Sequence, residues 1–257
     1  MSYQHLFVEH DGPFATITLD RQEKRNALAL DVMVELTQAF IDVAATDATG
    51  VILAANGPVF SAGHNFGDMA GASLPDIRHL FDVCTAMMNT VQSIPQVVIA
   101  RVHALATAAG CQLVATCDLA IAADTARFAT PGVNIGLFCS TPMVALSRAV
   151  PRKHAMEMLL TGDMIDAARA REIGLVNRVV PEAELDAATR ALATQIATKS
   201  PLSLAIGKTA FYRQAELPLA EAYDYAAAVI TRNMMAHDAA EGIDAFLAKR
   251  QPVWTGT

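Results

Sequence analysis

The chain has 257 residues, of which 53% are hydrophobic and 18% are charged, and its formal net charge at pH 7 is −7. This composition supplies ample apolar material for a globular core, as one large domain or one domain with an appendage. The acidic balance argues against non-specific binding of nucleic acid, although a few local cations can still hold an anionic ligand. No run of eighteen apolar residues occurs, so we expect no membrane-spanning helix.

The hydrophobic pattern predicts alternating strands and helices in the first half of the chain. Strands are expected at residues 14–19, 51–55, 97–102 and 118–123, and helices at 28–45, 74–91 and 110–116. This order is typical of an α/β fold with a parallel sheet. Further along, helices are expected at 141–150, 154–161, 166–173, 182–197, 203–212, 219–236 and 239–249, with one strand at 175–180.

The boundary between the two parts is expected near residue 200. Residues 1–200 are predicted to form the core, and residues 201–257 a C-terminal helical region rich in Ala and Met. These helices are expected to pack either on the core or on another subunit.

The four cysteines are spread through the chain without a C-x-x-C pair. This spacing predicts free thiols in a reducing compartment rather than a disulfide framework. The N-terminal sequence shows neither a secretory leader nor an Arg-rich transit pattern, so we expect a cytoplasmic protein, with a processed organellar form left open. The sequence has no cluster of Cys and His residues of the kind that predicts a metal site, and it has no glycine-rich nucleotide-binding motif.

Two loops of small residues are the most informative feature of the sequence. They are FSAGHN at residues 60–65 and ATAAGCQ at residues 106–112, and each lies between an apolar strand-like run and a predicted helix. Small side chains allow backbone N–H groups to approach a ligand, as in oxyanion holes and at helix N-termini. Taken singly, such loops are more often tight turns. If the two converge, they can bind the carbonyl oxygen of a thioester.

Five segments in order resemble the motifs of the crotonase superfamily, also called the enoyl-CoA hydratase/isomerase family. They are residues 19–28, 60–69, 106–118, 128–136 and 161–176. Segments 106–115, 136–142 and 246–254 are similar to sequences of the enoyl-CoA hydratase domain-containing protein 3 group. The resemblance implies a crotonase-like spiral of ββα turns, a C-terminal helical trimerisation region, and a homotrimer or a dimer of trimers. It also implies a hydratase-like lyase.

The resemblance assigns an oxyanion hole to this chain. Family members bind an acyl-CoA, whose coenzyme A is part of the substrate rather than a separate cofactor. By position, the two amides that meet the thioester oxygen are those of His64 and Ala109, and such donors stabilise the charge of an enolate. The substrate-binding positions implied are Lys24, Arg25, Ala27, Ala62, His64, Asn65, Phe66, Gly110, Gly132, Phe246 and Lys249, the last two toward a neighbouring subunit.

Two expected carboxylates are missing from this site. Hydratases of the superfamily carry glutamates at the positions of Gln112 and Gly132, which activate water and deliver a proton. Gln112 can orient a water but cannot act as a base, and Gly132 has no side chain. Hydratase activity is therefore expected to be weak or absent. On the same reasoning, Gln112→Glu with Gly132→Glu is expected to raise the hydration of crotonyl-CoA.

Several interpretations of the site stay open at this point. The alternatives to a hydratase-like enzyme are an acyl-CoA decarboxylase of the same fold and a non-catalytic acyl-CoA-binding protein. Cys139 is a candidate acyl-contacting group, nucleophile or weak acid, although a lone cysteine in an apolar run is more often inert packing. Asp68 is expected to supply charge at a helix N-terminus, and His103 a structural hydrogen bond.

Overall fold

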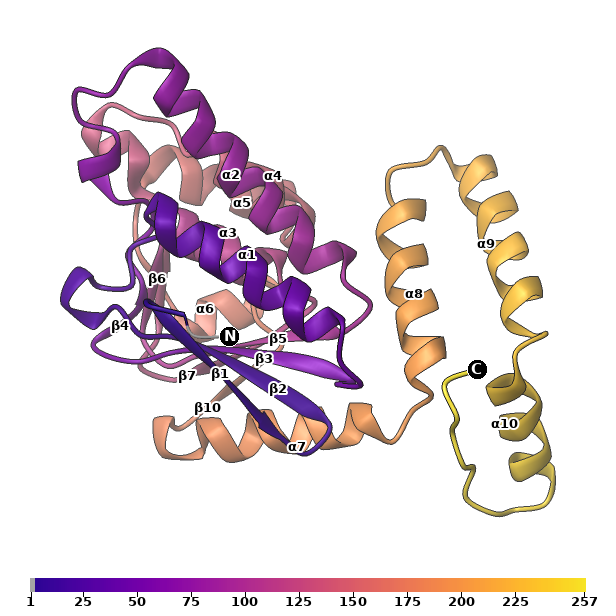
Figure 1. Ribbon diagram of the computed structural model, residues 1–257. Helices are drawn as coiled ribbons and strands as arrows, with labels where there is room; N and C mark the ends of the chain where they lie inside the picture. The colour runs from indigo at the N-terminus through magenta and orange to yellow at the C-terminus, as the bar shows by residue number, and fades with distance from the viewer. Residues whose placement is uncertain (1–2) are drawn as a thin grey trace.

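The computed structural model describes residues 3–257, whose strands form two sheets (Figure 1). The larger sheet has the order β1-β2-β3-β5-β7-β10, and the smaller sheet has the order β4-β6-β8-β9. The strands of the larger sheet are β1 (Leu6–Asp11), β2 (Phe14–Leu19), β3 (Gly50–Ala55), β5 (Val97–Val102), β7 (Leu119–Ala123) and β10 (Arg178–Val180). Those of the smaller sheet are β4 (Val59–Ser61), β6 (Leu105–Thr107), β8 (Arg127–Ala129) and β9 (Ile165–Asp166).

The α-helices follow the predicted order closely. They are α1 (Leu30–Ala44), α2 (Leu74–Ser93), α3 (Ala109–Thr116), α4 (Ser140–Ala149), α5 (Arg152–Thr161), α6 (Ala167–Glu172), α7 (Leu185–Ala197), α8 (Pro201–Gln214), α9 (Leu219–Asn233) and α10 (His237–Leu247). Short 3₁₀ turns include η1 (Gln22–Lys24), η2 (Phe66–Asp68) and η3 (Pro131–Ile135). No helix in the described part of the chain is both long and apolar enough to cross a membrane.

The chain advances as a spiral in which each turn contributes one strand to each sheet. The successive units are β3-β4-α2, β5-β6-α3 and β7-β8-α4. The first strand of each unit pairs in parallel within the larger sheet, and the second pairs in parallel within the smaller sheet. The α/β fold and the spiral of ββα turns predicted from the sequence are confirmed.

Side chains of the parallel strands alternate between two apolar layers. Leu53 and Val98 face the main core beneath α1, α2 and α3, whereas Ile52 and Ile99 face the second layer beneath α7. The period of two follows from strand geometry, and burial on both faces explains why these strands are continuous apolar runs in the sequence. All four cysteines are buried and free, as the absence of a C-x-x-C pair predicted.

Five strands escaped the sequence prediction. Three of them, β4, β6 and β8, have only three residues each, and β9 has two. Runs this short carry no measurable periodicity. The fifth, β1, pairs antiparallel with β2 at the sheet edge and alternates weakly. The two small-residue segments at 60–65 and 106–112 therefore begin within β4 and β6, and not directly after the longer strands β3 and β5.

The last three helices lie beside the core rather than over the sheet (Figure 1). Helix α8 is held to the core by the buried Lys208, whose Nζ donates to the carbonyls of Val91 and Gln96 and lies 2.8 Å from Asp118 Oδ2. Asp118 also accepts from the hydroxyl of Tyr212. The assignment of residues 201–257 to an oligomerisation region stays a prediction.

Candidate active site

Three loops meet because they leave the same end of three neighbouring parallel strands. Within the smaller sheet, Ser61 of β4 pairs with Ala106 of β6, and Thr107 of β6 pairs with Ala129 of β8. The carboxyl ends of adjacent parallel strands lie together at one sheet edge, where α/β proteins commonly bind ligands. The loop after β4, the N-terminus of α3 and the segment after β8 are thus brought side by side.

The first two loops are in direct contact at Gly63. A Cβ added there would lie 2.8 Å from Ala108 Cβ, 2.9 Å from Thr107 O and 3.1 Å from Ala109 N. Gly63 also has φ +84°, a conformation that glycine adopts without steric cost. Any side chain at this position would push the two loops apart, so the convergence expected from the sequence is present.

Ala108 shows the strain that this arrangement requires. Its φ of 51° and ψ of −118° lie in a region that L-residues rarely occupy. Such a conformation costs on the order of 1–3 kcal/mol and persists only where surrounding contacts determine it. One of those contacts is the bond from Ala108 N to Ala129 O, 2.9 Å long. The strained residue directly precedes Ala109 at the start of α3.

The backbone N–H groups of His64 and Ala109 have no acceptor among the hydrogen bonds of residues 3–257. Ala109 is the first residue of α3, and the first N–H groups of a helix lack an intrahelical partner. Both residues line the same cavity. Unpartnered N–H donors, one of them at the positive end of a helix, are groups of the kind that stabilise a carbonyl oxygen as it gains negative charge.

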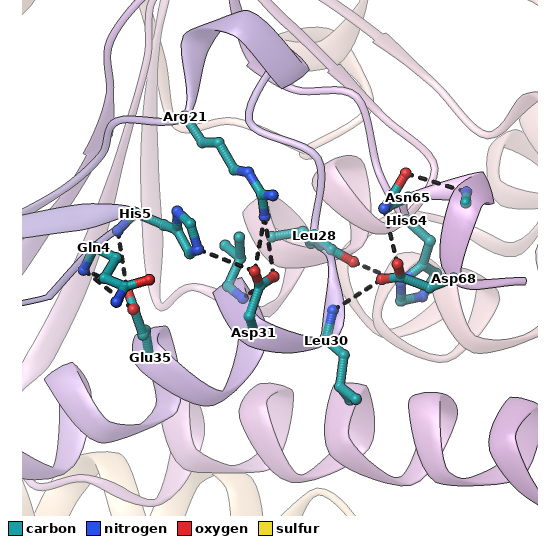
Figure 2. A network of polar contacts seen from close by, with 12 residues as sticks. Gln4, His5, Arg21, Leu28, Leu30, Asp31, Glu35, His64, Asn65 and Asp68 are labelled. Carbon is teal, nitrogen blue, oxygen red and sulfur yellow. Dashed lines mark hydrogen bonds and ion pairs between the residues drawn. The ribbon is translucent and has the colours of Figure 1, made fainter.

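The first loop is tied to the N-terminus of α1 (Figure 2). Leu28 N donates to Gly63 O over 2.8 Å, and Leu30 N donates to Asp68 Oδ2 over 3.1 Å. The other oxygen of Asp68 accepts from Asn65 Nδ2 over 2.9 Å. Asp68 therefore does supply charge at a helix N-terminus, that of α1, and it holds the loop there. His103 likewise makes the predicted structural contact, with Nε2 2.8 Å from Gly57 O.

The ring of His64 is packed in the cavity wall. Its Nδ1 lies 3.3 Å from Leu28 O, and its plane meets Phe81 edge to face with centroids 5.4 Å apart. Nε2 is buried without a hydrogen-bond partner. Burial lowers the pKa of His64, while the contact with Leu28 and the charge of Asp68 oppose this shift. The imidazole is therefore neutral at pH 7.

The cavity has a volume of about 680 Å³ and mostly apolar walls. None of the described residues that line it is acidic, and none is lysine or arginine. Its lining residues are Ala62, His64, Phe66, Met69, Phe81, Thr107, Ala108, Ala109, Pro131, Gly132, Asn134, Ile135, Gly136, Leu137, Phe138, Cys139, Ser140, Thr141 and Pro142. The size and polarity suit a mainly apolar small molecule.

Gln112 lies one turn into α3 but does not line the cavity. Its side chain is only 6% exposed, and its Oε1 is buried without a partner. Gly110, also expected to bind substrate, is packed against β4, where an added Cβ would lie 2.5 Å from Ser61 O. Gly110 therefore allows α3 to approach β4, and its place is behind the cavity wall.

Gly132 lines the cavity, yet the space for a side chain there is already filled. A Cβ would lie 2.8 Å from Leu137 O and 3.0 Å from Cys139 Sγ. The segment is folded back on itself, since Leu137 N donates to Gly132 O and Gly132 N lies 3.4 Å from Cys139 Sγ. Burial raises the pKa of the Cys139 thiol, although the Gly132 N–H opposes this effect. A glutamate at Gly132 must therefore displace these atoms, and the gain in hydration expected from restoring it stays a prediction.

The remaining predicted binding residues fall into two groups. Lys24, Arg25 and Ala27 adjoin the first loop, because Ala62 N donates to Arg25 O over 3.0 Å. Ala62 and the exposed Phe66 line the cavity, and Asn65 caps η2 by accepting from Gly67 N. Phe246 and Lys249 lie in or directly after α10, away from the loops of the same chain (Figure 1).

Sequence reasoning missed the apolar lip of the cavity. Ile135 ends the η3 turn, and Leu137 and Phe138 follow it; the three residues are 57%, 48% and 42% exposed. Phe81 of α2 and Met69 also line the cavity. The apolar residues on either side of Gly136 in the sequence could have indicated this part of the cavity, since exposed apolar clusters mark ligand or partner sites.

The chain is similar to known proteins over nearly its whole length. A family model described as Enoyl-CoA hydratase/isomerase matches residues 9–257. The chain is 45% identical to the Rattus norvegicus protein named "Enoyl-CoA hydratase domain-containing protein 3, mitochondrial", over 96% of this chain and 83% of that one. It is 46% identical to the Homo sapiens protein of the same name, over 93% of this chain and 80% of that one.

Solved structures give the same result. An enoyl-CoA hydratase from Mycobacterium smegmatis superposes with a TM-score of 0.95 and 46% identity, covering 98% of this chain and 99% of that one. The human enoyl-CoA hydratase domain-containing protein 3 superposes with a TM-score of 0.95 and 43% identity, covering 98% and 100%.

The names of the relatives correct one prediction. Five relatives from vertebrates, 43–46% identical to this chain, are all named mitochondrial, so the expectation of a cytoplasmic protein is wrong. The resemblance to the crotonase superfamily, and within it to the enoyl-CoA hydratase domain-containing protein 3 group, is confirmed. The chain belongs to the enoyl-CoA hydratase/isomerase family.

Proposed function

We propose that this protein binds an acyl-CoA thioester with its carbonyl oxygen between the amides of His64 and Ala109, and that the hole stabilises the enolate. The observation that supports this most is the meeting of two unpartnered N–H groups in one apolar cavity. Loss of one such donor typically raises a reaction barrier by about 3–4 kcal/mol. The proposal requires no metal and no cofactor beyond the coenzyme A of the substrate.

Hydration is expected to be weak or absent in this site. Addition of water to an enoyl thioester needs a base for the water and an acid for the α carbon. No carboxylate lines the cavity among residues 3–257. Gln112 carries an amide and does not line the cavity, and the position of Gly132 is closed by Leu137 and Cys139.

A neutral acyl group fits the cavity better than a dicarboxylic one. Decarboxylation of a malonyl-type thioester requires the free carboxylate of the acyl group to be bound in the cavity, in addition to the thioester. Burial of an unpaired carboxylate is strongly unfavourable, and the walls contain no lysine or arginine. The decarboxylase alternative is therefore disfavoured. The remaining alternative to an enzyme is a protein that binds acyl-CoA without converting it, and a turnover measurement separates the two.

The coenzyme A moiety is proposed to lie beside the first loop. Lys24 and Arg25 are exposed, and neither makes an ion pair within the described residues, so both are available for phosphate groups. The side chain of Phe246 on α10 is 82% exposed, and other large apolar side chains of residues 201–257 are also exposed. We propose that this surface packs in a homotrimer or a dimer of trimers, with Phe246 and Lys249 near a neighbouring site.

The test is a spectroscopic measurement on the bound carbonyl. Butanoyl-CoA labelled with ¹³C at the thioester carbon should bind, as measured by calorimetry. Its carbonyl stretch should move to lower frequency, because two hydrogen bonds polarise the C=O group. The variant Gly63→Val, which forces the two loops apart, should lose that shift. Tight binding with an unshifted carbonyl would contradict the oxyanion hole.

A further inference from the structure

The cavity contains very few groups that can move a proton. Among its described lining residues, the side chains that titrate in an accessible range are those of His64 and Cys139. The Cys139 thiol is buried and its pKa is raised, so it stays protonated at neutral pH and cannot accept a proton. His64 remains as the single candidate for a base.

The contacts of His64 select one tautomer of its ring. Nδ1 faces the carbonyl oxygen of Leu28 at 3.3 Å, and a carbonyl can only accept a hydrogen bond. The proton must therefore be on Nδ1, which leaves a lone pair on Nε2. Nε2 is buried and has no partner within residues 3–257. A buried acceptor without a partner is unfavourable, and catalytic groups are among those that native proteins keep in this state.

We propose that the imidazole of His64 is the catalytic base that removes the α proton of the bound acyl thioester, so that one residue provides both the base and an oxyanion donor. This proposal rests on the proposed function. The C–H bond at the α carbon breaks and an N–H bond forms at Nε2. The electron pair forms the C=C bond of the enolate, and the carbonyl π electrons move onto the oxygen held by the amides of His64 and Ala109.

Return of a proton from Nε2 completes the reaction. When the hydrogen on Nε2 first exchanges with water, protonation at the α carbon regenerates the saturated thioester with its α hydrogen replaced by solvent hydrogen. For a β,γ-unsaturated acyl group, return at the γ carbon gives the α,β-unsaturated isomer. Nε2 is covered in the free protein, so side chains around the ring, which include Phe81 in edge-to-face contact with it, must shift for the α carbon to reach Nε2.

The charges around His64 suit this role. Burial in the cavity wall beside the apolar Phe81 keeps the free imidazole neutral, whereas the contact with the Leu28 carbonyl favours the protonated ring. Asp68 on η2 is the charged group that acts on it, and the negative charge favours the imidazolium formed in the step. The exchange rate should fall when the free imidazole is protonated. Because the pKa of His64 is lowered, this fall should occur below the ordinary histidine value of 6.5.

The test is α-proton exchange of butanoyl-CoA in D₂O, followed by ¹H NMR with the intact protein. His64→Asn keeps a donor for Leu28 O, and His64→Gln places an amide near the position of Nε2. Both keep the backbone amide and lack a base. Exchange should fall by about 10²-fold or more in each variant, while calorimetry should show affinity for butanoyl-CoA close to that of the wild type. The matched control is His79→Gln, an exposed histidine of α2, which should exchange at the wild-type rate.

The outcomes separate this inference from the proposed function. Wild-type exchange that persists in both His64 variants would overturn the role of the imidazole and leave the oxyanion hole standing. Binding of butanoyl-CoA without any exchange in the wild type would overturn the base and leave a binding protein. A ¹⁵N spectrum that shows the proton of the free protein on Nε2 would also overturn the assignment.

Discussion

Gly132 is the position where the structure makes its most direct steric prediction. A methyl group in Gly132→Ala would lie 2.8 Å from Leu137 O, closer than Cβ atoms approach carbonyl oxygens, and 3.0 Å from Cys139 Sγ. The backbone at Gly132 is not in the left-handed region, so the effect is steric alone. Overpacking of this kind costs about 1–3 kcal/mol. For a chain of this size, each kcal/mol lowers Tm by about 2–4 °C.

Thermal unfolding of two alanine variants provides the assay. Gly207→Ala is the matched control, because Gly207 lies within α8 and an added Cβ meets nothing within 4 Å. Alanine is a better helix former than glycine, so this control should be neutral or more stable by about 0.5–1 kcal/mol. A Tm of Gly132→Ala equal to that of the wild type would refute the reasoning.

The same packing decides whether hydration can be restored. Glutamate at Gly132 must displace the backbone at Leu137 and the thiol of Cys139 before its carboxylate can reach a substrate. Gln112→Glu with Gly132→Glu should therefore give little gain in hydration of crotonyl-CoA, measured by the loss of enoyl absorbance. A gain of orders of magnitude would show that the segment after η3 opens easily.

Two further predictions concern stability. Lys208→Met leaves the largely buried Asp118 without its cation, and breaking such a pair costs about 3–5 kcal/mol. The urea midpoint of unfolding should therefore fall sharply, and it should recover in part when Asp118→Asn is added. An unchanged midpoint in Lys208→Met would contradict this prediction. Burial alone would raise the pKa of Asp238, but bonds from Ser200 and Thr255 outweigh it and lower the pKa. Because the folded pKa is the lower one, the contribution of Asp238 is present above its unfolded pKa and is lost as pH falls through the folded value. Acid unfolding below about pH 4 should become shallower in Asp238→Asn, and identical acid profiles would exclude this carboxylate.

The sequence predicted the larger sheet and the helices because long apolar runs carry a clear period. The strand at 14–19 matches β2, and the helix at 110–116 matches α3 to within one residue. The two loops at 60–65 and 106–112 were identified by residue size alone. Their convergence depends on β4 and β6, whose three residues each are too few for any pattern.

Other properties of the site were inaccessible for a physical reason. Whether Gly132 has room for a side chain depends on Leu137 and Cys139, which approach it only after the chain folds back. The free lone pair of His64 depends on the carbonyl of Leu28, from a segment 36 residues away. Such features arise from tertiary contacts between segments, and local propensity does not encode them.

The strained link at Ala108 and the backbone donors beside it have a consequence for how this fold changes in evolution. The groups proposed to hold the carbonyl oxygen belong to the main chain, so substitutions at neighbouring positions leave them in place as long as Gly63 and Gly110 persist. Ligand recognition and proton chemistry can therefore diverge independently. A lineage can exchange its acids and bases one at a time while it keeps the same class of ligand, which is how one scaffold comes to host several reactions.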